Sequence, residues 1–182
     1  NFLLSGQFTL PYSLMGITSS STNSYKLPEF HKWRMNAEWY VPIGLPRGEE
    51  KNKQFILKIA AKYGFIGRYN KKLDISPFER FQLGDAGLSN NFALLGYDII
   101  AHRGYPVYDK SNPRINPEDI TPSQFFTIFN KYAMELRYPF STSAGSTIYG
   151  LAFFEAANGW YDFKSYNPFK LRRSAGVGLR FF

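Results

Sequence analysis

The stretch Trp33-Arg-Met-Asn-Ala-Glu-Trp-Tyr-Val-Pro-Ile43 decides the fold class. Apolar side chains occupy every second position from Trp33 to Ile43, and Arg34, Asn36 and Glu38 lie between them. A period of two is the pattern of a β-strand whose two faces meet different surroundings. The stretch therefore predicts a strand with one apolar and one polar face.

Five further segments repeat this alternation and predict strands of similar length. They lie at about 2–10, 55–66, 132–139, 147–157 and 171–182, and the alternation is poorest in 147–157. Strands of about ten residues match the ~9–11 residues that cross a bilayer at a tilt, whereas strands in water-soluble proteins are usually ~5–6 residues long. Length therefore favours an all-β transmembrane antiparallel β-barrel, with its apolar face towards lipid and its polar face towards the lumen.

Two tryptophans, Trp33 and Trp39, share the apolar face of the best-defined strand. Indole rings favour the headgroup level of a membrane. We therefore expect Trp33 and Trp39 to form a lipid-interface belt, with a ligand-binding platform as the alternative.

Composition excludes several classes of protein. No apolar run reaches the ~18 residues of a membrane helix, so a helical membrane protein is excluded. The chain has no Cys and two scattered His, so we expect no metal site and no cofactor. The net charge is +8, but Lys and Arg alternate with apolar residues and no nucleic-acid-binding motif accompanies them. The 19% of aromatic residues also suits a sugar-binding β-sandwich, which composition leaves open.

The alternation stops between about residues 68 and 129. A loop of this length in a compact domain is usually functional or disordered. Its apolar stretches and prolines predict that it packs against another part of the protein. We treat residues 1–182 as one domain that carries this long loop.

Motifs in and after this loop resemble one known family. The loop contains Phe78-Glu-Arg-Phe-Gln-Leu-Gly84 and Asp98-Ile-Ile-Ala-His-Arg-Gly-Tyr105, and it is followed by Tyr132-Ala-Met-Glu-Leu-Arg-Tyr-Pro139 and Phe153-Phe-Glu-Ala-Ala-Asn-Gly-Trp160. Their order is similar to the sixth extracellular loop and the following strands of BamA-type barrels, the bacterial surface antigen family. The family has Val or Ile where this chain has His102, and we expect His102 to be an exposed loop residue.

The resemblance implies a partial barrel of about six strands from a larger one. By the alignment the chain lacks the last two strands of the family barrel and the periplasmic domains that precede it. The long loop would be extracellular and folded into the lumen. The turns at 44–53 and 140–146 would then be periplasmic, and the loops at 16–28 and about 158–170 extracellular.

The resemblance also implies a loop anchor made of Arg103, Gly104 and Tyr105. The lumen residues Glu135 and Glu155 match acidic positions of the family. We hypothesise that Arg103 bridges both carboxylates, with Phe153 and Tyr105 packed on its guanidinium plane, because this planar group can bond two carboxylates and stack on a ring together. The alternative is that the two glutamates pair with lumen lysines such as Lys58 or Lys62.

The function implied is outer-membrane assembly, without enzymatic activity. Such a factor folds and inserts unfolded β-barrel clients, works with accessory lipoproteins through its periplasmic domains, and contacts outer-membrane lipids. A TamA-like or two-partner secretion transporter carries the same Arg-Gly-aromatic loop and is the first alternative. A passive outer-membrane channel is the second, and a soluble sugar-binding sandwich is the third.

Overall fold

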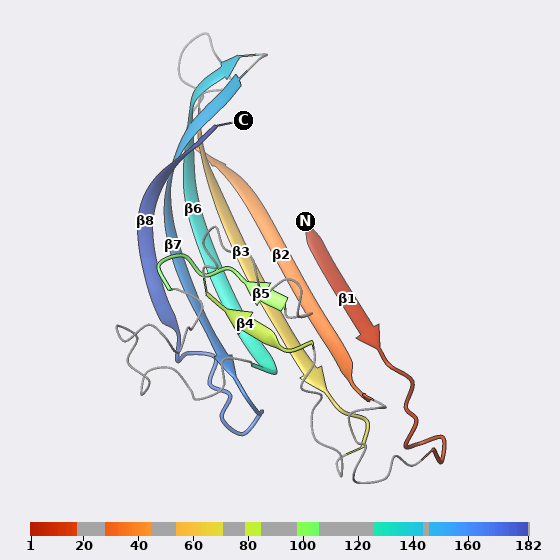
Figure 1. Ribbon diagram of the computed structural model, residues 1–182. Helices are drawn as coiled ribbons and strands as arrows, with labels where there is room; N and C mark the ends of the chain where they lie inside the picture. Colours follow the sequence, from red (N-terminus) through yellow and green to blue (C-terminus); the bar gives the residue numbers. More distant parts are fainter. Residues whose placement is uncertain are drawn as a thin grey trace.

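The computed structural model describes residues 1–17, 28–44, 54–70, 79–84, 98–105, 126–143 and 146–181. These residues form eight strands, whose arrangement is drawn in Figure 1. The strands are β1 (Phe2–Phe8), β2 (His31–Ile43), β3 (Phe55–Gly67), β4 (Phe81–Leu83), β5 (Asp98–Ile100), β6 (Ile128–Ser143), β7 (Ser146–Trp160) and β8 (Arg172–Phe181). Among these residues no helix is long and apolar enough to span a membrane.

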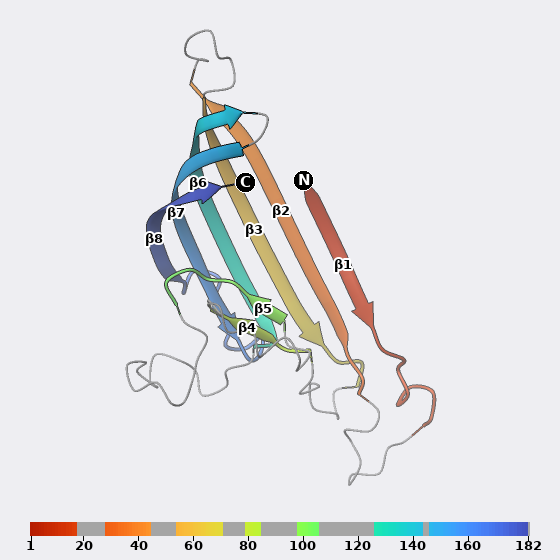
Figure 2. The same ribbon diagram turned by 45° about the horizontal axis from the view of Figure 1, so that its top comes forward.

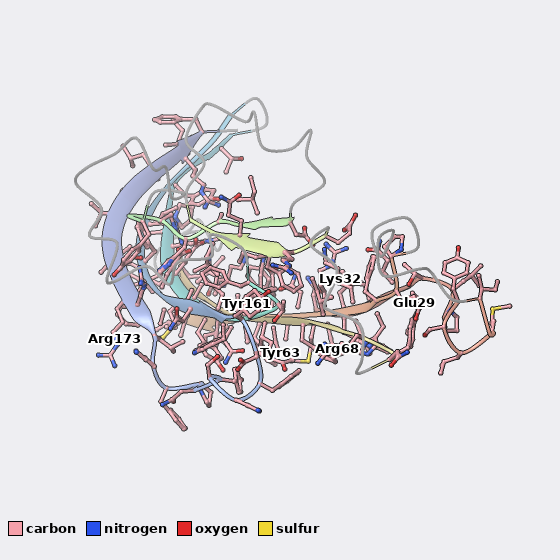
Figure 3. The ribbon with its side chains drawn as sticks, turned by 60° about the horizontal axis from the view of Figure 1, so that its bottom comes forward. Glu29, Lys32, Tyr63, Arg68, Tyr161 and Arg173 are labelled. Carbon is pink, nitrogen blue, oxygen red and sulfur yellow. The ribbon has the colours of Figure 1, made fainter. Side chains whose placement is uncertain are left out.

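Six strands form one open antiparallel sheet in the order β1-β2-β3-β6-β7-β8. Figures 1 and 2 show β1 and β8 at its two edges, so the sheet does not close. The short strands β4 and β5 pair in parallel and lie over the concave side of the curved sheet (Figure 3). The predicted all-β antiparallel fold is therefore confirmed as part of a barrel wall.

The two faces of the sheet have the predicted character. On the convex face Trp39, Met134 and Phe154 are exposed, and Val177 of β8 is 85% exposed. On the concave face the charged side chains Lys32, Glu135 and Glu155 are buried. An apolar surface of this extent marks a membrane or protein contact, because soluble monomers rarely expose large contiguous apolar patches.

A small apolar core lies where the long loop crosses the concave face. It consists of Phe30, Ile66, Phe81, Phe126 and Phe129, and the rings of Phe81 and Phe129 meet edge to face at 4.7 Å. Phe81 of β4 also exchanges backbone hydrogen bonds with Phe126, at 2.9 and 2.7 Å. The loop is thus packed against the barrel wall by burial of apolar surface.

The long segment, expected as a loop from about 68 to 129, includes short strands that the sequence did not predict. It contains the β4–β5 pair, and β6 already begins at Ile128. Three-residue strands are too short to show a period of two in the sequence. They form here because Phe81 and Ile100 pack on the core of the concave face.

The turn expected at 140–146 is shorter than the sequence indicated. β6 extends to Ser143 and β7 begins at Ser146, with a shift of register between Pro139 and Ser141. Proline cannot donate to the ladder and is tolerated at such irregularities, so Pro139 disturbs the pairing without ending the strand. Most of the predicted turn at 44–53 and of the loop at 16–28 lies outside the described residues.

Candidate functional site

Two carboxylates of the concave face form the base of the site. Glu135 lies on β6 and Glu155 on β7, and their cross-strand partners are Phe153 and Ala133. The odd-numbered residues of both strands point to the concave side, so Glu135 and Glu155 lie diagonally next to each other. Their exposed fractions are 6% and 2%. Buried carboxylates need partners, because an unpaired buried charge is strongly unfavourable.

Arg103 of the long loop supplies the main partner for both carboxylates. Its Nε and Nη2 donate to Glu155 Oε1 at 3.0 and 2.7 Å, and Nη2 also donates to Glu135 Oε1 at 2.7 Å. The backbone N–H of Arg103 donates to Glu155 Oε2 at 3.0 Å. The guanidinium carbon lies 3.7 Å from the centroid of the Phe153 ring. The structure thus brings Arg103, Glu135, Glu155 and Phe153 together with the geometry that favours arginine over lysine.

Further cations surround the two carboxylates. Lys131 Nζ lies 3.0 Å from Glu155 Oε1, Arg137 Nη2 lies 2.5 Å from Glu135 Oε2, and Arg180 Nη2 lies 3.6 Å from Glu135 Oε1. Lys131 also donates to the carbonyl oxygen of Ala101 in the loop. Burial lowers the pKa of Arg103, but its bonds to the carboxylates outweigh this and raise the pKa above its usual value. The arginine therefore stays charged in the docked loop.

Gly104 and Tyr105 complete the tight turn after Arg103. Gly104 has a φ of +82°, a conformation that residues with a Cβ rarely adopt. The hydroxyl of Tyr105 donates to the carbonyl oxygen of Arg173 on β8 at 2.9 Å. The Tyr105 ring does not take the place expected for it on the guanidinium. It stacks instead on His102, with ring centroids 4.5 Å apart and an angle of 21° between the planes.

His102 was expected to be exposed, and this expectation is wrong, because its exposed fraction is 0%. Among the described residues neither ring nitrogen of His102 has a hydrogen-bond partner. Burial lowers its pKa to about 4, against the opposing charge of Glu155. A neutral ring stacked on Tyr105 can fill an apolar position, which suits a place where the resemblance implies Val or Ile.

A second contact of the loop was not identified from the sequence. Lys32 of β2 has 1% of its side chain exposed, and its Nζ lies 3.2 Å from Glu79 Oε2 and 2.8 Å from Asp98 Oδ2. Arg34 Nη1 lies 2.7 Å from the same Asp98 oxygen, and Lys32 Nζ is 4.8 Å from the centroid of Phe81. Alternation along β2 placed the two cations on the polar face, but no sequence pattern pointed to their loop partners.

A polar cavity of about 250 Å³ adjoins the anchor. Its lining carries both signs of charge and comprises Glu38, Lys58, Ala60, Lys62, Ala101, Arg103, Lys131, Ala133, Glu135, Glu155 and Arg180. Lys58 forms its ion pair with Glu38 at 3.0 Å, and the lysine that pairs with Glu155 is Lys131. Among the described residues no group of three or more acidic or histidine side chains could hold a metal ion.

The two tryptophans both lie on the convex face, with different surroundings. Trp39 is 54% exposed. Trp33 is partly covered, and its ring meets Phe8 of β1 edge to face at 5.1 Å. They lie six positions apart along β2, which corresponds to roughly 20 Å along the strand at ~3.3 Å per residue. The spacing suits two levels of an apolar band about 25 Å tall.

Comparison with known proteins agrees with this architecture. Residues 13–182 match the Omp85 superfamily domain, and these residues include every strand from β2 to β8. Searches of the curated proteins and of the solved structures gave no match. Since the family match covers nearly the whole chain, this protein belongs to the Omp85 superfamily, whose members are non-enzymatic outer-membrane β-barrels of protein assembly and transport.

Proposed function

We propose that this chain is the loop-bearing part of the barrel of a BamA-type assembly factor, which folds and inserts client β-barrels into the outer membrane. The observation that carries the proposal is the contact of Arg103 with the buried carboxylates of Glu135 and Glu155. Its partners are unfolded outer-membrane clients, accessory lipoproteins that bind its periplasmic domains, and membrane lipids. Its work is mechanical, because assembly of a barrel breaks no covalent bond of the client.

The docked loop contacts several strands on the inside of the barrel wall. Asp98 holds β2 through two cations, Phe81 packs on β6, Arg103 ties β6 to β7, and Tyr105 reaches β8. One loop therefore connects strands at both sides of the sheet across its concave face (Figure 1). These contacts of the loop would keep the curvature of this part of the wall fixed while strands elsewhere in the barrel open for a client.

Orientation follows from the loop. We infer that the end of the sheet at which β3 stops and β6 begins is extracellular, because the family's long loop is extracellular. The short connections between β2 and β3 and between β6 and β7 are then periplasmic. The exposed apolar convex face, including Trp39, faces lipid in this arrangement.

The test uses the full-length protein that contains this chain. Arg103→Ala is introduced, and the folded levels of several unrelated outer-membrane barrels are measured from their heat-modifiable gel mobility. An assembly factor is expected to show lower folded levels of several clients while Arg103→Ala itself remains inserted. Arg68→Ala, which removes an exposed arginine directly after β3 and outside the anchor, is the matched control and should leave clients unchanged.

The same experiment decides between members of the superfamily. Unchanged clients in the Arg103→Ala strain would favour a TamA-like protein or a two-partner secretion transporter. A passive channel is the further alternative, and the charged cavity beside Arg103 is the observation that favours it. A channel should give a large, stable conductance in planar bilayers that Arg103→Ala increases by releasing the loop.

A further inference from the structure

The segment between β7 and β8 folds back over the convex face of the sheet. Figure 3 shows it on the side of Tyr63, opposite to β4 and β5. The Tyr166 ring lies edge to face against Trp160 at 4.9 Å and against Tyr63 at 6.4 Å. Phe163 contacts Phe65 of β3 in the same way at 5.8 Å. Residues 161–170 are thus packed on the outside of the wall, beside the membrane.

Two asparagines of the convex face hold this segment in place. Asn130 of β6 and Asn158 of β7 are direct cross-strand partners. Asn130 Nδ2 donates to the Tyr166 hydroxyl at 2.9 Å, and Asn158 Nδ2 donates to the Lys170 carbonyl oxygen at 2.7 Å. Asn130 is only 2% exposed as a result. Polar amides on a lipid-facing surface are unfavourable without partners, so these two bonds give the fold-back a physical reason.

The outer side of this segment is aromatic and basic. Phe169 is 87% and Phe163 59% exposed, and Lys164 and Lys170 are exposed beside them in the sequence. Arg173 is exposed on the convex face of β8, opposite Ala156 and on the outside of the curved strand in Figure 3. Asp162, the one acidic residue of the segment, accepts the backbone N–H of Ser165 at 2.7 Å. The surface therefore carries three cations against one acid engaged in its own turn.

We propose that residues 161–170 and Arg173 form a binding site for the phosphate-bearing headgroups of the outer leaflet. Aromatic side chains at the rim favour the interfacial layer, and cations there bind anionic headgroups. Lys164, Lys170 and Arg173 would contact the phosphates, and Phe163 and Phe169 would enter the layer beneath. The inference rests on the membrane location in the proposed function and adds a lipid ligand that the loop anchor does not involve.

The test measures lipid binding to the purified full-length protein in neutral detergent micelles by native mass spectrometry. Bis-phosphorylated lipid A is the probe, and dephosphorylated lipid A with the same acyl chains is the comparison. Each removed cation should weaken binding about fivefold, so Lys164→Gln, Lys170→Gln and Arg173→Gln together should weaken it roughly a hundredfold. Heat-modifiable mobility checks that each variant is folded.

One control tests whether only the convex face of β8 binds the lipid, and a second tests whether binding depends on the positive charge. Arg172→Gln removes the neighbouring cation, whose strand partner Ala157 faces the concave side, and should leave binding unchanged. Lys164→Arg with Lys170→Arg keeps the charge and should bind as the wild type does.

Four results would overturn the proposal. The first two are wild-type affinity in the triple variant and equal binding of dephosphorylated lipid A. The third is an equal effect of Arg172→Gln and Arg173→Gln. The fourth is displacement of lipid A by millimolar inorganic phosphate, which would indicate a site for the free anion. Because no client is present, a negative result here would leave the assembly function standing. Unchanged clients in the Arg103→Ala strain would likewise leave this lipid site standing.

Discussion

Replacing Arg103 with Met should release the long loop from the wall of the folded barrel. The substitution keeps an apolar stem against Phe153 but removes the charge shared by Glu135 and Glu155. Removing one partner of a buried ion pair typically costs ~3–5 kcal/mol. Each carboxylate keeps another cation within 3.0 Å, which places the effect near the lower end, at about 3 kcal/mol. The undocked population should therefore rise roughly a hundredfold.

Hydrogen exchange of the loop backbone measures that population directly. The Arg103 amide is protected by Glu155, and the Asp98 amide donates to the carbonyl oxygen of Arg80 at 3.2 Å. Exchange of the 98–105 peptide in the reconstituted full-length protein should accelerate about a hundredfold in Arg103→Met, because local opening governs exchange of protected amides. Arg68→Met, which changes an exposed arginine directly after β3, should exchange as the wild type does.

A disulfide provides the rescue for this experiment. A Cβ at Gly104 would lie 3.5 Å from the Ser174 Cβ, a separation within the range for disulfides, ~3.5–4.5 Å. Oxidised Gly104→Cys/Ser174→Cys should restore protection in Arg103→Met, although the positive φ of residue 104 costs about 1–2 kcal/mol in both backgrounds. The charge exchange Arg103→Glu/Glu155→Arg should restore it in part. Wild-type exchange in Arg103→Met would refute the anchor and make Arg103 a loop residue without consequence for docking.

Three further perturbations test other parts of the site. His102 is neutral in the docked loop, where its pKa is about 4, against 6.5 in the free loop. Between these two values the undocked loop binds more protons than the docked loop. The free energy of docking should therefore weaken by about 2 kcal/mol from pH 7 to pH 5. His102→Val should abolish this dependence in hydrogen exchange corrected for intrinsic rates, and an unchanged slope would contradict the assignment. Lys32→Met should weaken docking by about 2–3 kcal/mol in the same assay, since it removes one of the two cations that hold the loop to β2; exchange equal to the wild type would show that the second contact is dispensable. Gly159→Ala would place a Cβ 2.3 Å from Phe126 Cγ and should destabilise the barrel by about 1–3 kcal/mol, seen as a lower temperature of heat modification, whereas Gly178→Ala, with no atom nearer than 3.8 Å, should show no such shift.

Most of the barrel wall could be predicted from the sequence, because consecutive residues of a strand point to opposite faces and therefore alternate between apolar and polar. The alternation around Trp39 and Val177 identified strands and their outward faces, and the structure places both residues on the exposed convex surface. Glu135 and Glu155 could be proposed as partners of Arg103 because the resemblance implies acidic lumen positions there, although the alternation in 147–157 is too poor to show which way Glu155 points. The prediction failed where segments are too short to show a period, as in β4 and β5.

Contacts between distant segments were decided only by the tertiary structure. The burial of His102, the stacking of Tyr105 on it and the pairing of Lys32 with Asp98 depend on how the loop lies across four or more strands. The same holds for the hydrogen bond between Tyr166 and Asn130 on the convex face of the sheet. Alternation is a local property of the sequence, and it fixes which face of the sheet a side chain occupies. The residue that this side chain contacts depends on the register of the sheet and the path of the loop. Both are set by packing between residues far apart in the chain.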